Sequence, residues 1–152
     1  MNVVLRAARR EDADALTALF LAARRNAMPY LPELHTDSET RCWMEQKVLT
    51  GDRVTVAELS NEIVGFSAVR RDHIDHLYVS PGEQGKGIGS LLLDRIKAES
   101  GSDLSLYVFL KNARARAFYE RRGFACVAYS DGSANEENEP DAIYLLKETP
   151  SE

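Results

Sequence analysis

The sequence predicts an α+β fold: a central mixed, mostly antiparallel β-sheet of six to seven strands with helices on both faces. Three observations support it. Residues 53–59 (RVTVAEL) and 62–70 (EIVGFSAVR) have strand character and are joined by Ser60-Asn61, as in an antiparallel hairpin. Residues 104–110 (LSLYVFL) would be apolar on both faces, as in a central strand, and they follow a helical segment. Two further strand-like segments follow near the end of the chain.

The N-terminal part of the chain alternates one strand with two helices. Residues 3–9 are predicted to form the first strand. Apolar residues recur at helical spacing over residues 11–27, which have acidic residues in their first turn. The two prolines of MPYLPELH end this helix. A second helix is predicted over residues 36–49, because its start (TDSE) has the spacing of a capping box.

The second half contributes the remaining strands and helices. Strands are predicted over residues 73–79, 125–130 and 142–148, and helices over residues 89–100 and 112–124. Within residues 73–79, an extra residue between Ile74 and Leu77 interrupts the alternation of apolar side chains. A β-bulge near Asp75-His76 would restore a common inward face. The alternative is a loop that precedes a shorter strand.

Length and composition predict a single domain over residues 1–152. A net charge of -5 argues against a nucleic-acid binder, and no apolar run is long enough to span a membrane. The N-terminus lacks the apolar region of a secretory signal, so we expect a cytoplasmic protein. The three histidines, His35, His73 and His76, do not have metal-ligand spacing, so we expect no metal.

Four glycines lie in the segment SPGEQGKGIGS (residues 80–90), immediately before a predicted helix. Exposed backbone N–H groups at a helix start bind phosphate well. The spacing fits neither the P-loop, which needs GxxxxGK[ST], nor the dinucleotide motif GxGxxG after a first strand. Both of these interpretations therefore fail on spacing.

The pattern Gln84-x-x-Gly87-x-Gly89, preceded by LYVSP, resembles the signature of the GCN5-related N-acetyltransferases (GNAT superfamily). NARARAFYERRGF further along is similar to that superfamily's Asn-x-x-Ala-x-x-Phe-Tyr-x-x-x-Gly-Phe segment. The order of elements agrees over nearly the whole chain. The resemblance implies the acyl-CoA N-acyltransferase (GNAT) fold, acetyl-CoA as cosubstrate, and transfer of the acetyl group to a primary amine.

The resemblance also implies where acetyl-CoA would lie. The pantetheine arm would pair with the backbone of one strand, and the pyrophosphate would rest on the glycine-rich segment. The residues implied in cofactor binding are Leu77, Tyr78, Val79, Gln84, Gly85, Lys86, Gly87, Ile88, Gly89, Ser90, Asn112 and Phe118. Lys86 adds a cation or points into solvent. Asn112 would also cap the helix that it begins.

Direct attack by an amine requires a general acid and a general base. Tyr119 matches the family's tyrosine and would protonate the CoA sulfur, because a phenol with a pKa of about 10 is a weaker acid than a thiol at about 8.5. Its alternative role is that of a core aromatic residue. Asp75 matches best the acid that members of this superfamily often carry as the base, and His73 and His76 are its rivals.

The acceptor is a small molecule or a peptide or protein N-terminus; the sequence does not distinguish them. Glu33 and His35 lie where the family's variable acceptor loop would be, and Glu137 lies in the acidic loop 131–141. Each would contact the acceptor or remain a solvated surface group. The resemblance allows a homodimer. Two other functions stay open: an acyl-CoA sensor without turnover, and a nucleotide-binding domain.

Overall fold

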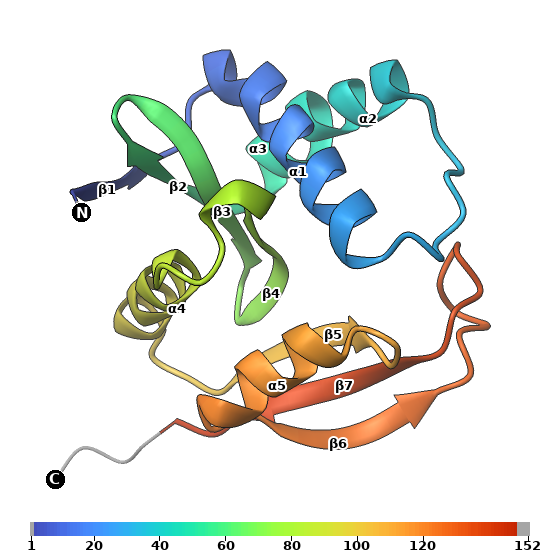
Figure 1. The fold of residues 1–152 in the computed structure, drawn as a ribbon. Coiled ribbons are helices and arrows are strands. Elements are labelled where there is room, and N and C mark those ends of the chain that lie inside the picture. The colour runs from blue at the N-terminus through green and yellow to red at the C-terminus, as the bar shows by residue number, and fades with distance from the viewer. Residues whose placement is uncertain (1, 149–152) are drawn as a thin grey trace, which may run out of the picture.

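Seven strands form one sheet in the order β1-β2-β3-β4-β5-β7-β6 in the computed structural model, which describes residues 2–148 (Figure 1). The strands are β1 (Val3–Ala7), β2 (Arg53–Leu59), β3 (Glu62–Arg70), β4 (His73–Val79), β5 (Leu104–Phe109), β6 (Ala125–Ser130) and β7 (Asp141–Leu146). Neighbouring strands are antiparallel except β4 and β5, which are parallel. The predicted mixed, mostly antiparallel sheet is confirmed.

The helices are α1 (Ala13–Ala27), α2 (Asp37–Trp43), α3 (Leu49–Gly51), α4 (Ile88–Glu99) and α5 (Ala113–Arg121). Three short turns accompany them: η1 (Arg10–Asp12), η2 (Met44–Val48) and η3 (Pro81–Glu83). A π-helical turn, η2, joins α2 to α3, so the helix predicted over residues 36–49 is present with a local widening. Its capping box is present as well: Thr36 Oγ1 accepts from the Glu39 N–H over 3.1 Å, and Glu39 Oε1 accepts from the Thr36 N–H over 2.8 Å.

Helix α1 covers one face of the sheet. Leu16 and Phe20 of α1 are buried in one cluster with Val56 of β2 and Phe66 of β3. Fully burying a side chain of this size contributes about 1.5–3 kcal/mol. Figure 1 shows α1, α2 and α3 gathered beside the N-terminal half of the sheet. This packing fixes α1 relative to β3 and β4, on which it lies.

Helices α4 and α5 cover the opposite face. Ile88 and Leu92 of α4 are buried with Val64 of β3, and Tyr119 of α5 is buried with Tyr144 of β7. Figure 1 shows α5 lying across β5 and β7. The sheet therefore has helices on both faces, as the sequence predicted.

Gly65 of β3 sets how closely α4 approaches the sheet. A β-carbon at Gly65 would lie 3.0 Å from Ile88 Cγ2 and 3.2 Å from the Tyr78 carbonyl oxygen. Such contacts are tighter than normal packing allows. The absence of a side chain at Gly65 thus lets the first turn of α4 sit directly against β3 and β4.

Candidate active site

Strands β4 and β5 separate shortly after they meet. They pair only at His73–Ser105 and Ile74–Leu106. On its other edge, β4 pairs with β3 through a bulge, where Ile74 faces Val69 and His76 faces Ala68. Asp75 is the extra residue, so the predicted bulge is confirmed. Beyond it, among the described strands, the β5-side edge of β4 has no pairing partner.

Helix α4 begins beside this open edge. Gly87 precedes its first turn with φ at 83°, a left-handed conformation that glycine adopts without strain. No described side chain caps this helix start. The first intrahelical bond runs from the Leu91 N–H to the Gly87 carbonyl over 3.1 Å. The N–H groups before Leu91 in the first turn have no such partner and carry the partial positive charge of the helix.

A cleft of about 660 Å³ lies between the open edge of β4, the start of α4 and α5. We call it the glycine-loop cleft. Of the residues predicted to bind the cofactor, it is lined by Leu77, Tyr78, Val79, Gln84, Gly85, Gly87, Ile88, Gly89, Ser90, Asn112 and Phe118. Lys86 is not among the lining residues; its Nζ pairs instead with Glu83 Oε2 over 2.7 Å. Glu83 itself lines the cleft, so Lys86 is held beside the cleft without being part of its lining.

Sequence reasoning missed the cationic side chains of this cleft. Lys111, Arg114, Arg121 and Arg122 line it, and all come from α5 or from residues adjoining it. Their signal was the basic character of KNARARAFYERR, but only tertiary packing shows which of them face the cleft. The set suits a ligand that carries phosphate groups.

Arg122 holds the cleft wall together. Its guanidinium lies 3.7 Å from the centre of the Phe118 ring, and it donates to the Ser90 hydroxyl and to the Phe118 carbonyl. A β-carbon at Gly89 would lie 3.2 Å from Phe118 Cε1. Phe118 therefore packs between Arg122 and the first turn of α4. This packing connects α5 to the glycine-rich segment.

Tyr119 lies deep in the same cleft, with a side chain only 7% exposed. Burial, together with the neighbouring Tyr78, raises the pKa of Tyr119 above its usual value. Its hydroxyl therefore keeps its proton at neutral pH. Asn112 caps α5, as predicted, by accepting from the Ala115 N–H over 3.3 Å. Both side chains lie where a ligand in the cleft would contact them.

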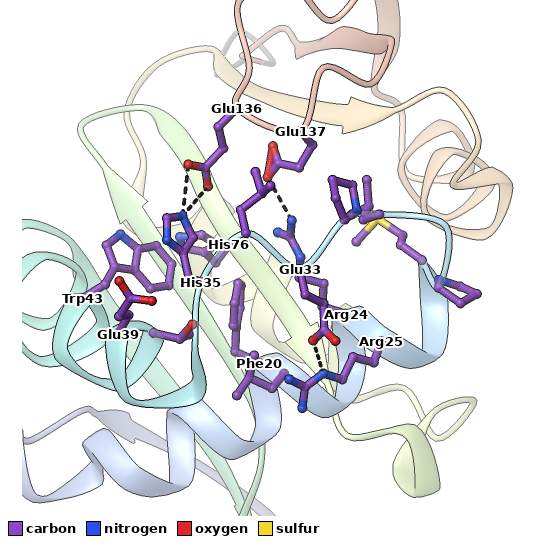
Figure 2. A pocket seen from close by; sticks show the side chains of 17 residues that line it. Phe20, Arg24, Arg25, Glu33, His35, Glu39, Trp43, His76, Glu136 and Glu137 are labelled. Atoms are coloured by element: carbon purple, nitrogen blue, oxygen red, sulfur yellow. Dashed lines mark hydrogen bonds and ion pairs between the residues drawn. The ribbon is translucent and has the colours of Figure 1, made fainter.

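A second hollow of about 660 Å³ lies on the α1 side of β4 (Figure 2). We call it the aromatic cavity. It is lined by Phe20, Leu21, Arg24, Arg25, Met28, Pro29, Leu31, Pro32, Glu33, Leu34, His35, Glu39, Thr40, Trp43, His76, Glu136 and Glu137. The structure thus brings together all three residues predicted to bind the acceptor, Glu33, His35 and Glu137, with the predicted catalytic residue His76.

Three rings form one wall of the aromatic cavity. Phe20 and Trp43 have ring centres 5.3 Å apart, and His76 lies 5.3 Å from Trp43 and 5.8 Å from Phe20. Burial lowers the pKa of His76 to about 4. The imidazole is therefore neutral at physiological pH.

Charged side chains close the cavity from the β6–β7 loop. Arg24 donates to Glu137 over 2.8 Å, and His35 Nε2 lies 3.1 Å from Glu136. Figure 2 shows both glutamates reaching from the loop toward residues of α1 and the segment after it. The acidic loop therefore borders the cavity rather than extending into solvent.

Tyr78 lies where the two hollows meet. Its side chain lines the glycine-loop cleft. Its ring also packs edge-on against Phe20, with centres 5.3 Å apart, and stacks on His76 at 6.1 Å. Tyr78, which lines the glycine-loop cleft, thus contacts two residues that line the aromatic cavity.

Asp75 and His73 lie apart from both hollows. They line a smaller, polar depression with Arg70 and Tyr107. Asp75 Oδ2 lies 3.5 Å from the Arg70 guanidinium, and His73 Nδ1 lies 2.9 Å from Ser105 Oγ. The structure does not bring Asp75 together with Tyr119 or with the proposed acceptor residues.

Within residues 2–148, no group of three or more histidine, cysteine, aspartate or glutamate side chains is arranged to hold a metal ion. No helix in the same range combines the length and apolar character needed to cross a membrane.

The sequence model of the acetyltransferase (GNAT) domain matches residues 50–126, about half of the 152-residue chain. The chain belongs to the GNAT family of acetyltransferases. The matched segment includes the split strand β4 and the glycine-rich segment, and it also includes all of α5. The family assignment made from the two sequence motifs is therefore confirmed.

Curated relatives are acetyltransferases with different acceptors in their names. A peptidyl-lysine N-acetyltransferase of Salmonella typhimurium is 26% identical over 137 residues, covering 86% of this chain and 89% of that protein. A mycothiol acetyltransferase of Beutenbergia cavernae is 48% identical over 56 residues, or 34% of this chain. The match spans only 19% of the length of the mycothiol enzyme.

Solved structures share the fold. A GCN5-related N-acetyltransferase from Rhodopseudomonas palustris has a TM-score of 0.79 at 23% identity, covering 97% of this chain and 96% of its own. The PaiA N-acetyltransferase of Thermoplasma acidophilum, solved in complex with coenzyme A, has a TM-score of 0.73 at 18% identity, with 97% and 99% covered. The GNAT fold predicted from the sequence is confirmed.

Proposed function

We propose that this chain transfers the acetyl group of acetyl-CoA to a primary amine by direct attack, with Tyr119 as general acid. The observation that carries the proposal is the glycine-loop cleft. In it an unpaired strand edge, an uncapped helix start and the Tyr119 hydroxyl meet. This combination offers backbone pairing, phosphate binding and a proton donor in one place.

The residues present fit acetyl-CoA. The free N–H groups at the start of α4 and the cationic side chains of α5 and Lys111 suit its phosphates. The unpaired backbone of Leu77 to Val79 suits the amides of its pantetheine arm. Bound acetyl-CoA would supply the acetyl group as a thioester, activated toward amines.

Tyr119 holds the proton that the departing sulfur needs. Its raised pKa keeps the hydroxyl protonated at neutral pH. Tyr119 also lines the glycine-loop cleft. It is therefore available to donate to a ligand in the cleft.

For proton uptake from the amine we propose His76 rather than Asp75. His76 lines the aromatic cavity beside the cleft, whereas Asp75 lies in the separate depression with Arg70. The neutral imidazole accepts a proton from the amine nitrogen, directly or through one water, as the new C–N bond makes that nitrogen more acidic.

The proposal is tested by measuring thiol release from acetyl-CoA with a panel of amines. Tyr119→Phe should lower kcat by about a hundredfold, as expected for loss of a general acid, while calorimetry gives an unchanged Kd for acetyl-CoA. Tyr129→Phe is the matched control, because Tyr129 is an exposed tyrosine of β6. Wild-type turnover by Tyr119→Phe would rule out the acid role.

Two further outcomes separate the alternatives. Tight acetyl-CoA binding without thiol release for any amine would identify an acyl-CoA sensor. Thermal stabilisation by ATP or NAD, and not by acetyl-CoA, would identify a nucleotide-binding domain.

A further inference from the structure

We propose that the aromatic cavity selects a small arylalkylamine: a primary amine on an aromatic body, with no carboxylate beside the amine. This inference rests on the proposed function and names the acceptor class of the same site. Three features of the cavity carry it: its ring wall, the state of its arginines, and its closure by the β6–β7 loop.

The ring wall favours an aromatic body. Phe20, Trp43 and His76 lie within 5.3 to 5.8 Å of one another, ring centre to ring centre. Leucine, methionine and proline side chains supply much of the remaining lining. A flat aromatic group gains from both ring contacts and burial of apolar area here, whereas a flexible aliphatic amine gains only burial.

The charges favour an amine without a carboxylate. Four glutamates line the cavity, against two arginines. Arg24 is bound to Glu137 over 2.8 Å, and Arg25 is bound to both Glu33 and Asp37. A carboxylate on the acceptor would therefore meet an excess of negative charge and two guanidinium groups already engaged. A protonated amine entering the cavity is attracted by the same charge distribution.

The closure favours a small molecule over a peptide. The Arg24–Glu137 ion pair and the His35–Glu136 hydrogen bond each join the β6–β7 loop to the N-terminal part of the chain. A peptide chain leaving the cavity in this direction would have to part them. A volume of about 660 Å³ accommodates a free arylalkylamine without that opening.

Binding can be measured without turnover, because Trp43 is the only tryptophan of the sequence and lines the cavity. Intrinsic fluorescence is titrated with phenethylamine, phenylalanine, phenylalaninamide and butylamine. Phenethylamine should bind at least about tenfold more tightly than phenylalanine and more tightly than butylamine. Equal or tighter binding of phenylalanine or butylamine would overturn the proposal, and tightest binding by phenylalaninamide would favour a peptide N-terminus instead.

Turnover with the same four amines should follow the same order in kcat/KM. Glu137→Gln supplies a second test, because it releases Arg24 from its ion pair. The ratio of kcat/KM for phenylalanine to that for phenethylamine should rise about tenfold in this variant, and an unchanged ratio would contradict the proposed role of the engaged arginine. Trp43→Leu should lower the preference for phenethylamine over butylamine by about two- to tenfold.

The failures of the two proposals are distinguishable. Fluorescence binding of phenethylamine without thiol release would support the acceptor class and overturn acetyl transfer. Thiol release with butylamine or phenylalanine, but not with phenethylamine, would support acetyl transfer and overturn the acceptor class.

Discussion

Arg24 of α1 donates a hydrogen bond to Glu137 of the β6–β7 loop across 2.8 Å, joining residues 113 positions apart in the sequence. The Glu137 side chain is only 9% exposed and that of Arg24 is 24% exposed, so the pair is largely shielded from water. Removing one partner of a shielded ion pair lowers stability more than removing one partner of an exposed pair. This bond therefore holds the loop over the aromatic cavity.

Removing either partner should weaken acceptor binding. We expect Arg24→Gln to raise the KM of an amine acceptor about tenfold, with a much smaller change in the KM of acetyl-CoA. The loss of acceptor binding free energy in the Arg24→Gln/Glu137→Gln double variant should be smaller than the sum of the two single losses, because the partners act as a unit. Steady-state kinetics with both substrates varied gives each KM.

The control for this cycle is Arg41→Gln. Arg41 binds Asp14 over 2.7 Å at a site where the aspartate is 84% exposed. Its loss should leave both KM values within about twofold of wild type, since exposed pairs contribute little. Additive single effects, or an equal effect of Arg41→Gln, would show that the loop is held by other contacts.

Gly87→Ala tests the helix start as the phosphate site. A β-carbon there meets no atom within 4 Å, so the change acts through the positive φ alone. The left-handed conformation costs alanine about 1–2 kcal/mol, and relaxation of the turn should re-aim the free N–H groups. We expect lower stability in urea and a Kd for acetyl-CoA raised several-fold by calorimetry.

Gly101→Ala is the matched control, because it also meets no atom within 4 Å and has no positive φ. It should leave the Kd for acetyl-CoA unchanged. If both variants bind acetyl-CoA like wild type, the start of α4 does not hold the phosphates.

His76 should make the protein less stable in mild acid. Its pKa is about 4 when folded and near 6.5 when unfolded, so the unfolded state binds more protons between these values. The free energy of unfolding is therefore unaffected by protonation of His76 above pH 6.5. It falls as the pH decreases toward 4, by up to about 3 kcal/mol. Urea denaturation of wild type and His76→Gln at pH 7.5 and pH 5 measures this difference.

In that comparison, His76→Gln should lose less stability than wild type on acidification. His35→Gln is the control, because the His35 ring is exposed and its variant retains His76. If wild type and His76→Gln lose equal stability between the two pH values, the ring is not kept neutral by burial.

Asp75→Asn and His76→Gln distinguish the two candidate bases. We expect His76→Gln to lower kcat by at least about tenfold and Asp75→Asn to change it by less than about threefold. Asp75 faces Asp52 instead, where burial and the Asp75 carboxyl raise the pKa of Asp52 to about 7. Thiol-release assays at saturating acetyl-CoA give the comparison, and a greater loss in Asp75→Asn would restore that carboxylate as the base.

The sequence predicted most of what depends on local chemistry. The hairpin at Ser60-Asn61, the capping box at Thr36 and the bulge at Asp75 all follow from short patterns, and all are present. The family resemblance assigned the glycine-rich segment, Asn112 and Phe118 to one ligand site, and these residues line the cleft, although its cationic side chains were missed.

What the sequence left open depends on tertiary packing. The alternation of β4 predicted the bulge, but not that Asp75 would face Arg70 while His76 faced Trp43. Arg122 reaches the cleft only because α5 packs beside α4, which no local pattern encodes. The aromatic cavity likewise gathers side chains from distant segments, so its rings could not be grouped from the sequence.

The short pairing between β4 and β5 should affect how fast the protein is degraded in the cell. Only two residue pairs join these strands, so a ligand bound between them would add backbone hydrogen bonds to the sheet. Binding that favours the folded state raises the free energy of unfolding by mass action. Resistance to proteolysis should therefore track the supply of the acyl donor, and the chain should be degraded fastest when that donor is scarce.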